Sequence, residues 1–404
     1  MRRKLDLRTG RPVWFAYRVP SVPTEKLTRD VKADVAVVGM GISGAMMAEA
    51  LTARGQSVVT IDRRGPMKGS TAATTALVQF EIDQPLAKLS GMIGRAKAEQ
   101  AWRRSRLAIE SLAARIQGLD IDCGLGRRPS LYLAGNMLGP GALREEAEAR
   151  RRAGIHATYL TAAALRERFG IGREGAILSY GNLTLDPRKL TAGMLLKAWE
   201  RGARLYAPAE AVAIEDGKDE VTIVTKAGPT VTAGHVVLAT GYELTDMVPA
   251  ASHRIISTYA IATRRQPRKL WPQQAFIWEA SDPYLYMRAT RDGRVICGGE
   301  DEEFSDEDKR DALIGKKAAR LSKKLARLFP GLDTDPEFAW AGSFGTTTTG
   351  LPYIGKVPRH PRILAVMGYG GNGITYSGIA SEIAAAAIEG RDDSDAGLFA
   401  FRRR

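Results

Sequence analysis

Hydrophobic and polar positions near the start of the chain follow two periods in turn. Residues 33–38 form a short, apolar, β-branched run that is typical of a buried strand. Helical spacing follows over 45–54, and Gly55 ends it. A second apolar run at 57–61 predicts another strand. Strand, helix and strand in this order predict one βαβ unit over 31–64.

The rest of the chain alternates between the same two periods. Asp186 and Pro187 are a favourable N-cap and first helical residue, so they predict the start of a helix. An Asp-Gly pair predicts a hairpin between 284–288 and 294–299. The expected helices are 85–118, 141–153, 187–200, 306–329 and 374–389, and the expected strands are 129–134, 203–206, 209–215, 220–225 and 230–239.

Residues 1–30 differ from this pattern because they combine prolines with Trp14, Phe15 and Tyr17. They predict an extended arm that is anchored on the body by its aromatic side chains. No apolar run approaches the roughly 20 residues that span a bilayer. The N-terminal segment also lacks the apolar core of a signal peptide. We therefore expect a cytoplasmic protein with no membrane partner.

Neither the net charge nor the potential metal-ligating residues predict a further partner or a metal ion. The charge of +14 raises the question of an acidic partner such as nucleic acid. The basic residues, however, are spread over Ala-rich helices, and only the tail at 402–404 is a tight cluster. This distribution favours a solvated surface, so no nucleic-acid partner is expected. The two cysteines and four histidines show no ligand spacing, so we expect no metal site.

The turn after the first strand has the glycine spacing of a dinucleotide site. Gly39 allows a tight turn, Gly41 lets a pyrophosphate approach the backbone, and Gly44 lets the helix lie close to the strand. The start of the helix offers N–H groups and partial positive charge to phosphates. Asp62, after the second strand, can accept hydrogen bonds from ribose hydroxyls. Together these features predict that the chain binds a dinucleotide.

Further motifs follow in a fixed order over nearly the whole chain after residue 30. They are Gly69-Ser70-Thr71, Leu238-Ala239-Thr240-Gly241, Trp340-Ala341-Gly342 with Gly350-Leu351-Pro352-Tyr353-Ile354-Gly355, and Gly370-Gly371-Asn372-Gly373-Ile374-Thr375. With the dinucleotide turn, this order resembles the D-amino-acid-oxidase-like family of FAD-dependent oxidoreductases, in the group of glycine and sarcosine oxidases.

The resemblance implies a mixed α/β fold. A Rossmann-like FAD-binding domain would be interleaved with a substrate domain that is built on a large mixed β-sheet. By this analogy the FAD-binding domain takes 31–85, 155–245 and 340–404, the substrate domain takes 86–154 and 246–339, and 1–30 form the arm.

The resemblance also implies how FAD is held. N–H groups of the last glycine-rich turn would meet the negative charge of reduced flavin. No cysteine follows residue 298, so FAD is expected to bind without a covalent link. The implied cofactor-binding residues are Gly39, Gly41, Ile42, Ser43, Gly44, Asp62, Arg63, Ser70, Thr71, Thr74, Thr75, Ala211, Thr240, Gly241, Gly342, Gly370, Gly371, Asn372, Gly373, Ile374 and Thr375.

The implied activity is oxidation of a C–N bond in an amine or amino-acid-like substrate, by hydride transfer to flavin N5. Molecular oxygen or another electron acceptor would then reoxidise the flavin. The strand 294–299 lacks the lysine that assists oxygen in sarcosine-type oxidases, which favours a dehydrogenase. One alternative is a 2-hydroxy-acid or polyol-phosphate dehydrogenase of the same fold, with His253 as base. Another is a flavoprotein that acts on or with RNA, which only the net charge supports.

The residues that bind a substrate carboxylate in these relatives are absent at the matching positions. Phe344 stands where glycine-oxidase-like members have an arginine. Thr375 stands where sarcosine-oxidase-like members have a basic residue, and 75–77, near their second basic position, carry no charge. Either the substrate is not a simple α-amino acid, or another cation binds it.

Arg288 is the candidate replacement. It alternates with Tyr284 and Tyr286, so the three should share one face of a strand. The competing interpretation is that Arg288 forms a surface ion pair with Glu300 or Asp301. The predicted catalytic residues are Tyr284, Tyr286, Arg288 and Phe344.

Overall fold

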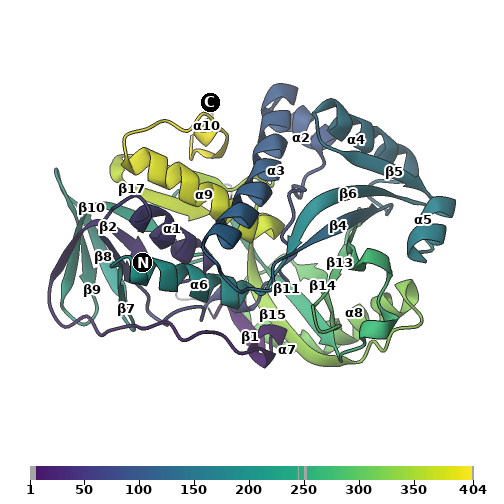
Figure 1. The fold of residues 1–404 in the computed structure, drawn as a ribbon, viewed down its shortest axis with the longest axis horizontal. Helices are drawn as coiled ribbons and strands as arrows, with labels where there is room; N and C mark the ends of the chain where they lie inside the picture. Colours follow the sequence, from purple (N-terminus) through teal and green to yellow (C-terminus); the bar gives the residue numbers. More distant parts are fainter. Residues whose placement is uncertain (1–5, 244, 250–252, 403–404) are drawn as a thin grey trace.

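The computed structural model describes residues 6–243, 245–249 and 253–402, and its helices pack around two β-sheets (Figure 1). The first sheet is mainly parallel: β10 pairs with β2 and β17, and β2 pairs with β3. Its spatial order is β16 (Tyr353–Val357), β17 (His360–Met367), β10 (Thr230–Leu238), β2 (Val31–Val38), β3 (Val58–Ile61) and β7 (Arg204–Tyr206), while β9 (Val221–Thr225) pairs with β10 and with β8 (Ala211–Asp216).

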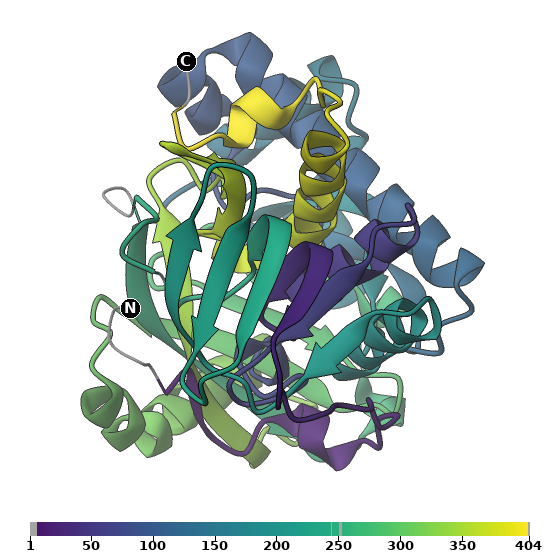
Figure 2. The ribbon, with the colours of Figure 1, turned by 90° about the vertical axis from the view of Figure 1, so that its left-hand side faces the viewer.

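Segments far apart in the sequence therefore lie side by side in this sheet. Figure 2 shows purple β2 beside the teal strands that include β10. The predicted βαβ unit is present, with α1 (Ile42–Thr52) between β2 and β3. Every residue of α1 after Ile42 is buried, because α6 (Pro187–Glu200) and α9 (Gly373–Ile388) pack against it. A helix that is apolar all round needs such complete cover.

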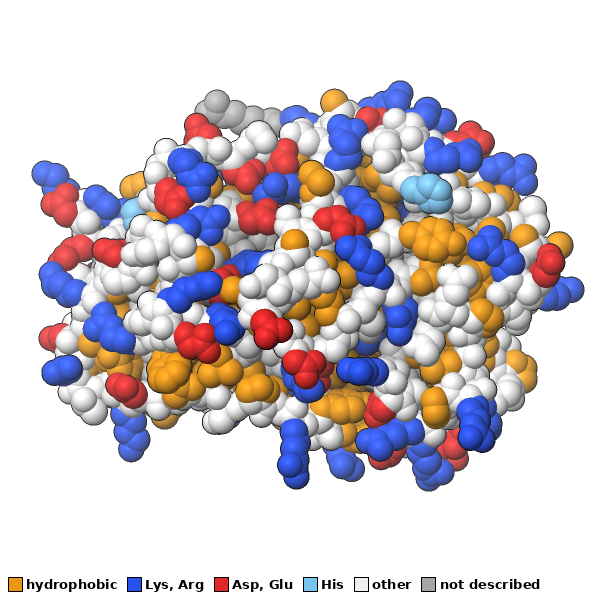
Figure 3. Space-filling model, viewed as in Figure 1, with side chains coloured by type: hydrophobic (Ala, Val, Ile, Leu, Met, Phe, Trp, Pro, Cys, Tyr) orange, Lys and Arg blue, Asp and Glu red, His pale blue; other side chains and the backbone are white. Residues whose placement is uncertain are grey.

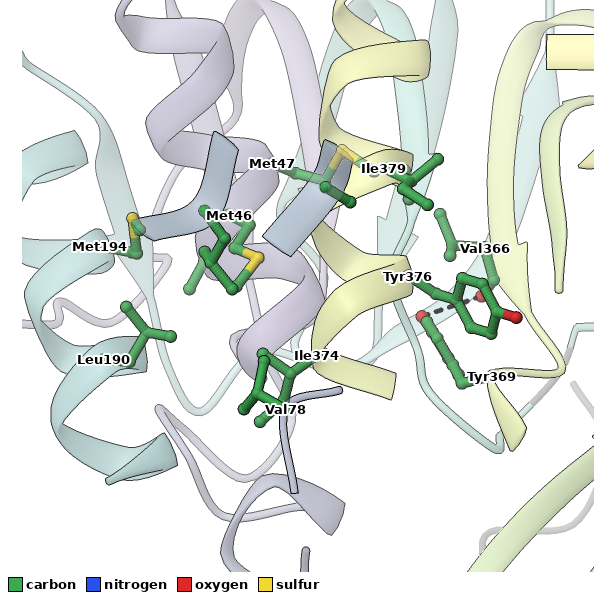
Figure 4. Packing of buried hydrophobic residues seen from close by; sticks show 14 of the residues in the cluster. Met46, Met47, Val78, Leu190, Met194, Val366, Tyr369, Ile374, Tyr376 and Ile379 are labelled. Carbon is green, nitrogen blue, oxygen red and sulfur yellow. Dashed lines mark hydrogen bonds between the residues drawn. The ribbon is translucent and has the colours of Figure 1, made fainter. Parts of the chain in front are cut away.

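Methionines from two helices fill much of this layer. Met46 of α1 lies near Met194 of α6, and Met47 of α1 lies beside Ile379 of α9, all in one buried cluster (Figure 4). Flexible thioether side chains fill irregular gaps between helices well. The cluster therefore holds the turn before α1 and the turn before α9 on one rigid base.

The second sheet is large and mixed, as the family resemblance implied. Most of its pairs are antiparallel, whereas β12 and β4 run parallel. Its order is β1 (Arg8–Gly10), β15 (Pro336–Thr347), β11 (His253–Thr263), β14 (Val295–Glu302), β13 (Leu285–Ala289), β12 (Phe276–Glu279), β4 (Gly126–Leu133), β6 (Gly175–Thr184) and β5 (Ala157–Thr161).

Helices cover this sheet and join it to the first. The helix α3 contacts both α9 and β6, so it bridges the two halves, as Figure 1 also shows. The helices of this half are α2 (Leu86–Ile93), α3 (Arg95–Gly118), α4 (Pro140–Arg152), α5 (Ala162–Phe169), α7 (Glu307–Ala312) and α8 (Ile314–Leu328), and α10 (Ala396–Phe399) lies near the C-terminus. Among the described residues, no helix is both long and apolar enough to cross a membrane.

Two of the predicted helices are divided in the structure. The helix expected at 85–118 breaks at Gly94, whose φ of 87° is outside the helical region. The helix expected at 306–329 is two helices separated by Leu313. The start at Asp186 and the hairpin between β13 and β14 are confirmed.

Three strands belong to a different sheet from the one that the expected domain boundaries assigned to them. Residues 155–245 were expected to belong with the FAD-binding unit, but β5 and β6 lie in the second sheet, where β6 pairs with β4. The segment from residue 340 was expected there too, yet β15 stays paired with β11 as far as Thr347. Long-range strand pairing decides both boundaries, and sequence periodicity does not report it.

The N-terminal arm lies on the body, held by its aromatic residues. Trp14 is buried and its indole N–H donates to Thr74 O at 2.6 Å. The Tyr17 hydroxyl donates to Asp292 Oδ1 at 2.8 Å, and β1 pairs with β15. Phe15 stays 44% exposed. The arm therefore contacts both the loop after β3 and the hairpin of the second sheet.

Candidate active site

A cavity lies where the two sheets meet. Its volume is about 440 Å³, which is typical of cofactor and small-molecule sites. One side is formed by the carboxyl ends of β2, β3 and β10, and the other by residues of β13 and β15. Ligands of open parallel sheets bind at the carboxyl ends of the strands.

The cavity brings together most residues that the sequence assigned to the cofactor. Tyr284, Tyr286 and Phe344 also line it, whereas Arg288 does not. Gly44 and Thr375 lie outside the lining as well. The assigned cofactor residues that line it are Gly39, Gly41, Ile42, Ser43, Asp62, Arg63, Ser70, Thr71, Thr74, Thr75, Ala211, Thr240, Gly241, Gly342, Gly370, Gly371, Asn372, Gly373 and Ile374.

Two glycines of the first turn are required by close backbone contacts. Gly39 has a φ of 118°, and a Cβ there would lie 2.4 Å from Ala239 O. A Cβ on Gly44 would lie 1.8 Å from Gly39 O, so only glycine lets α1 start this close to β2. Gly44 therefore acts through packing. The Thr71 hydroxyl oxygen accepts a hydrogen bond from Ile42 N at 3.0 Å. This bond holds the start of α1 against the Ser70–Ala72 turn.

Asp62 organises the turns at the nucleotide end of the cavity. Its Oδ2 accepts from Met40 N at 2.8 Å. Its Oδ1 accepts from Arg64 N at 2.7 Å and from Gly65 N at 2.8 Å. The carboxylate lines the cavity, and carboxylate oxygens can accept additional hydrogen bonds. The position suits the ribose contact that the sequence predicted.

An ion-pair cluster that the sequence analysis did not identify stands beside Asp62. Glu243 pairs with Arg63, and its Oε2 accepts from Arg64 Nη1 at 2.7 Å. All three side chains line the cavity. Only Arg63 had been assigned, because Glu243 follows the Thr-Gly turn of a different strand and reaches the arginines only through the tertiary fold.

The last glycine-rich turn packs against residues 79–83. Gly371 N donates to Asp83 Oδ2 at 2.8 Å, and Asn372 Nδ2 donates to Glu81 O at 2.6 Å. Thr375 Oγ1 donates to Gln79 O at 2.8 Å, and the side chain is buried in this contact. The Thr375 hydroxyl thus has a structural partner, while Gly370 to Ile374 line the cavity.

Aromatic side chains, among them Phe344, line the cavity, and we call them its aromatic wall. The rings of Tyr284 and Tyr286 stack with centroids 5.5 Å apart. Burial raises the pKa of both phenols, so both stay protonated near neutral pH. The Tyr284 hydroxyl donates to Asp301 Oδ2 at 2.9 Å. Trp278 and Tyr242 also line the cavity, and the sequence analysis had named neither.

Arg288 is not among the residues that line the cavity, contrary to the expectation that it would bind substrate. Its Nη1 donates to Ala76 O at 2.6 Å and to Leu185 O at 3.2 Å, and Thr184 Oγ1 accepts from Nη2. Only 2% of the residue is exposed, which also rules out the surface ion pair. Strand alternation correctly predicted a common face but not how far along it the cavity extends.

His253, the base considered for hydroxyl oxidation, lies outside the lining as well. Burial lowers its pKa to about 4, so the ring is neutral near pH 7. Its Nε2 is buried without a hydrogen-bond partner among the described residues. This arrangement gives a weak base that does not reach the cavity.

The residues present fit FAD. The cavity joins a helix N-terminus and a carboxylate at one end to a second turn rich in backbone N–H groups at the other. Phosphates, ribose and a flavin ring with negative charge near N1 need these groups in this order.

Comparisons with known proteins agree with this geometry. The chain is 22% identical over 408 residues to the probable oxidoreductase OrdL of Haemophilus influenzae, covering 95% of this chain and 89% of that protein. The glycine oxidase of Geobacillus kaustophilus has a similar fold, with a TM-score of 0.75, 21% identity and coverage of 92% and 99%. The L-proline dehydrogenase of P. horikoshii has a TM-score of 0.75 at 18% identity, with coverage of 92% and 97%.

The match to a family model is more specific than these pairwise comparisons. The model described as FAD dependent oxidoreductase, DAO, matches residues 34–387, from the first strand of the βαβ unit into the last turn of α9. This span includes both glycine-rich turns and the aromatic wall. The chain belongs to the DAO family of FAD-dependent oxidoreductases.

Proposed function

We propose that this oxidoreductase oxidises a C–N bond of a small amine-type substrate. The observation that carries the proposal is that the aromatic side chains of Tyr284, Tyr286 and Phe344 line the same cavity as the last glycine-rich turn. Relatives of similar fold are a glycine oxidase and an L-proline dehydrogenase, both of which act on amino compounds. When bound, FAD supplies the hydride acceptor at N5.

The chain's own residues would bind the cofactor and orient the substrate. The start of α1 would hold the pyrophosphate and Asp62 the ribose, in a site without a covalent link. The N–H groups of Asn372 to Ile374 would stabilise negative charge on the flavin ring. The aromatic wall would exclude water and hold the substrate carbon toward the flavin.

We also propose that oxygen is a poor acceptor for this protein. No lysine is among the described residues that line the cavity. The nearby Lys317 is buried beneath β14, where its Nζ donates to Glu300 O at 2.8 Å. A lysine held this way cannot supply a positive charge beside the flavin to assist oxygen reduction.

An anaerobic absorption titration tests the proposed function. The purified, flavin-loaded protein is mixed with amines, amino acids and 2-hydroxy acids, and bleaching of the visible flavin band is followed. We expect amines or amino acids to bleach the band and hydroxy acids to leave it unchanged. Bleaching by hydroxy acids alone would instead support the alternative chemistry of the same fold.

A further inference from the structure

The cavity has an unusual distribution of charge. Among its described lining residues, Arg63 and Arg64 are the only arginines, and no lysine is present. Both pair with Glu243 at the nucleotide end. Arg288 is committed to backbone carbonyls elsewhere. Among the described residues, a substrate carboxylate beside the aromatic wall would therefore be desolvated without a cationic partner, which is unfavourable.

A carboxylate lines the cavity instead. Asp83 lines the cavity, and its Oδ2 accepts from Gly371 N at 2.8 Å. Its other oxygen, Oδ1, has no hydrogen-bond partner among the described residues and is open to the cavity. Asp83 thus contacts the turn that is expected to meet the flavin, and it lines the same cavity as Tyr284.

The last glycine-rich turn makes room for this carboxylate. A Cβ on Gly370 would lie 2.4 Å from Asp83 Oδ2, and a Cβ on Gly371 would lie 2.7 Å from Oδ1. Any other residue at either position would push the carboxylate out of its place. The two glycines therefore serve the position of Asp83 as well as the approach of a cofactor.

The described groups around Asp83 supply no countercharge. The Asp83 side chain is exposed to the open cavity, but the protein that surrounds it desolvates the carboxylate and raises its pKa to about 6. The nearby charge of Asp301 adds to this effect, and the Gly371 N–H opposes it. The charge of Asp83 also acts on the phenols of Tyr132, Tyr242 and Tyr284. The pKa values of these phenols are raised, so all three are neutral near pH 7. An ionised Asp83 beside aromatic faces is a favourable environment for an organic ammonium.

We propose that the substrate is a cationic amine without an α-carboxylate, and that Asp83 binds its ammonium group and takes its proton. The inference rests on the proposed function. An N–H proton passes from the ammonium to an oxygen of Asp83, which frees the nitrogen lone pair. Hydride then leaves the neighbouring carbon with the C–H electron pair for oxidised flavin, the two-electron acceptor. The C=N bond of the iminium product forms from the lone pair.

Matched substrate pairs test the substrate class. Anaerobic flavin reduction is measured with 2-phenylethylamine against both enantiomers of phenylalanine, and with butylamine against norvaline. We expect the carboxylate-free member of each pair to reduce the flavin about ten-fold faster or more. If the amino acids reduce the flavin faster, the inference fails while the proposed function stands. If neither series reduces it, both fail.

A ligand that cannot react separates binding from chemistry. tert-Butylamine has no hydrogen on the carbon next to nitrogen, and its binding is followed through the visible flavin spectrum. In the wild-type holoenzyme we expect its affinity to fall as the pH drops through about 6, because protonation removes the charge of Asp83. Pivalate, the matched anion, should bind weakly at every pH. Tighter binding of pivalate, or a flat pH profile for the amine, would overturn the inference.

Asp83→Asn tests the residue itself. The amide oxygen can still accept from Gly371 N, so the turn should stay in place and FAD should stay bound. We expect the Kd for tert-butylamine to rise about ten-fold or more and its pH dependence near 6 to disappear. Asp219→Asn, at an exposed position, is the control. Wild-type binding by Asp83→Asn would overturn the role of Asp83.

Discussion

Single residues at this site divide into those that face the cavity and those that hold its walls. Arg288 is the clearest case of the second kind. Its guanidinium connects β13 to the carbonyls of Ala76 and Leu185, and burial lowers its pKa. Loss of the side chain would leave buried carbonyls without donors.

We therefore expect Arg288→Met to lower the free energy of unfolding by about 3 kcal/mol, since each abandoned buried acceptor costs about 1–3 kcal/mol. Denaturant unfolding of the flavin-loaded protein measures this. Arg291→Met, at an exposed position of the hairpin turn, is the control and should change little. Unchanged stability of Arg288→Met, together with weaker substrate binding, would restore the direct role first expected for Arg288.

The first glycine-rich turn gives a second prediction at this scale. A Cβ on Gly41 would lie 3.2 Å from Thr71 Oγ1, on the side of the cavity where the pyrophosphate is expected. We expect Gly41→Val to weaken FAD binding about ten-fold or more, because the branched side chain blocks backbone approach. Flavin absorbance retained after gel filtration measures it. Gly172→Val, where a Cβ meets open space, should retain FAD as the wild type does.

At the scale of elements, the site depends on how helix starts are held. The start of α1 is fixed by Thr71, and the start of α9 by its contacts with 79–83. The helix α6 starts at Asp186, whose Oδ1 accepts from Arg188 N at 2.8 Å and from Lys189 N at 3.1 Å. Because α6 packs on α1, its cap supports the dinucleotide end indirectly.

Asp186→Ala should therefore lower the free energy of unfolding by about 1 kcal/mol, the usual cost of losing an N-cap. Asp186→Asn keeps an acceptor oxygen and should cost much less. Thermal unfolding of both variants distinguishes the cap from the carboxylate charge. An equal loss in the two variants would show that charge, and not capping, stabilises this helix start.

At the scale of the whole molecule, the face seen in Figure 3 gives little support to the RNA alternative. On the face shown in Figure 3, lysine and arginine side chains are interspersed with aspartate and glutamate. Among the described residues, no metal-ligating cluster offers a further cofactor. The candidate cofactor-binding and substrate-binding side chains gather in the cavity between the two sheets.

The choice of electron acceptor is also a property of the whole molecule. We expect the substrate-reduced protein to be reoxidised slowly by oxygen and at least about ten-fold faster by an artificial quinone or dye, because no lysine lines the cavity in the part of the chain that the structure describes. Stopped-flow recovery of the flavin band with each acceptor measures this. Recovery in air as fast as with the dye would identify an oxidase.

The sequence by itself determined the βαβ unit and the two glycine-rich turns, because short periodic patterns and backbone sterics specify them locally. The order of the motifs along the chain carried the resemblance to the family. The FAD-dependent oxidoreductase prediction was confirmed on this basis. Sheet membership of β5, β6 and β15 was decided only in the tertiary structure, since strand pairing joins distant segments. The same holds for Arg288 and Asp83: one is buried and the other faces the cavity because of neighbours more than a hundred residues away.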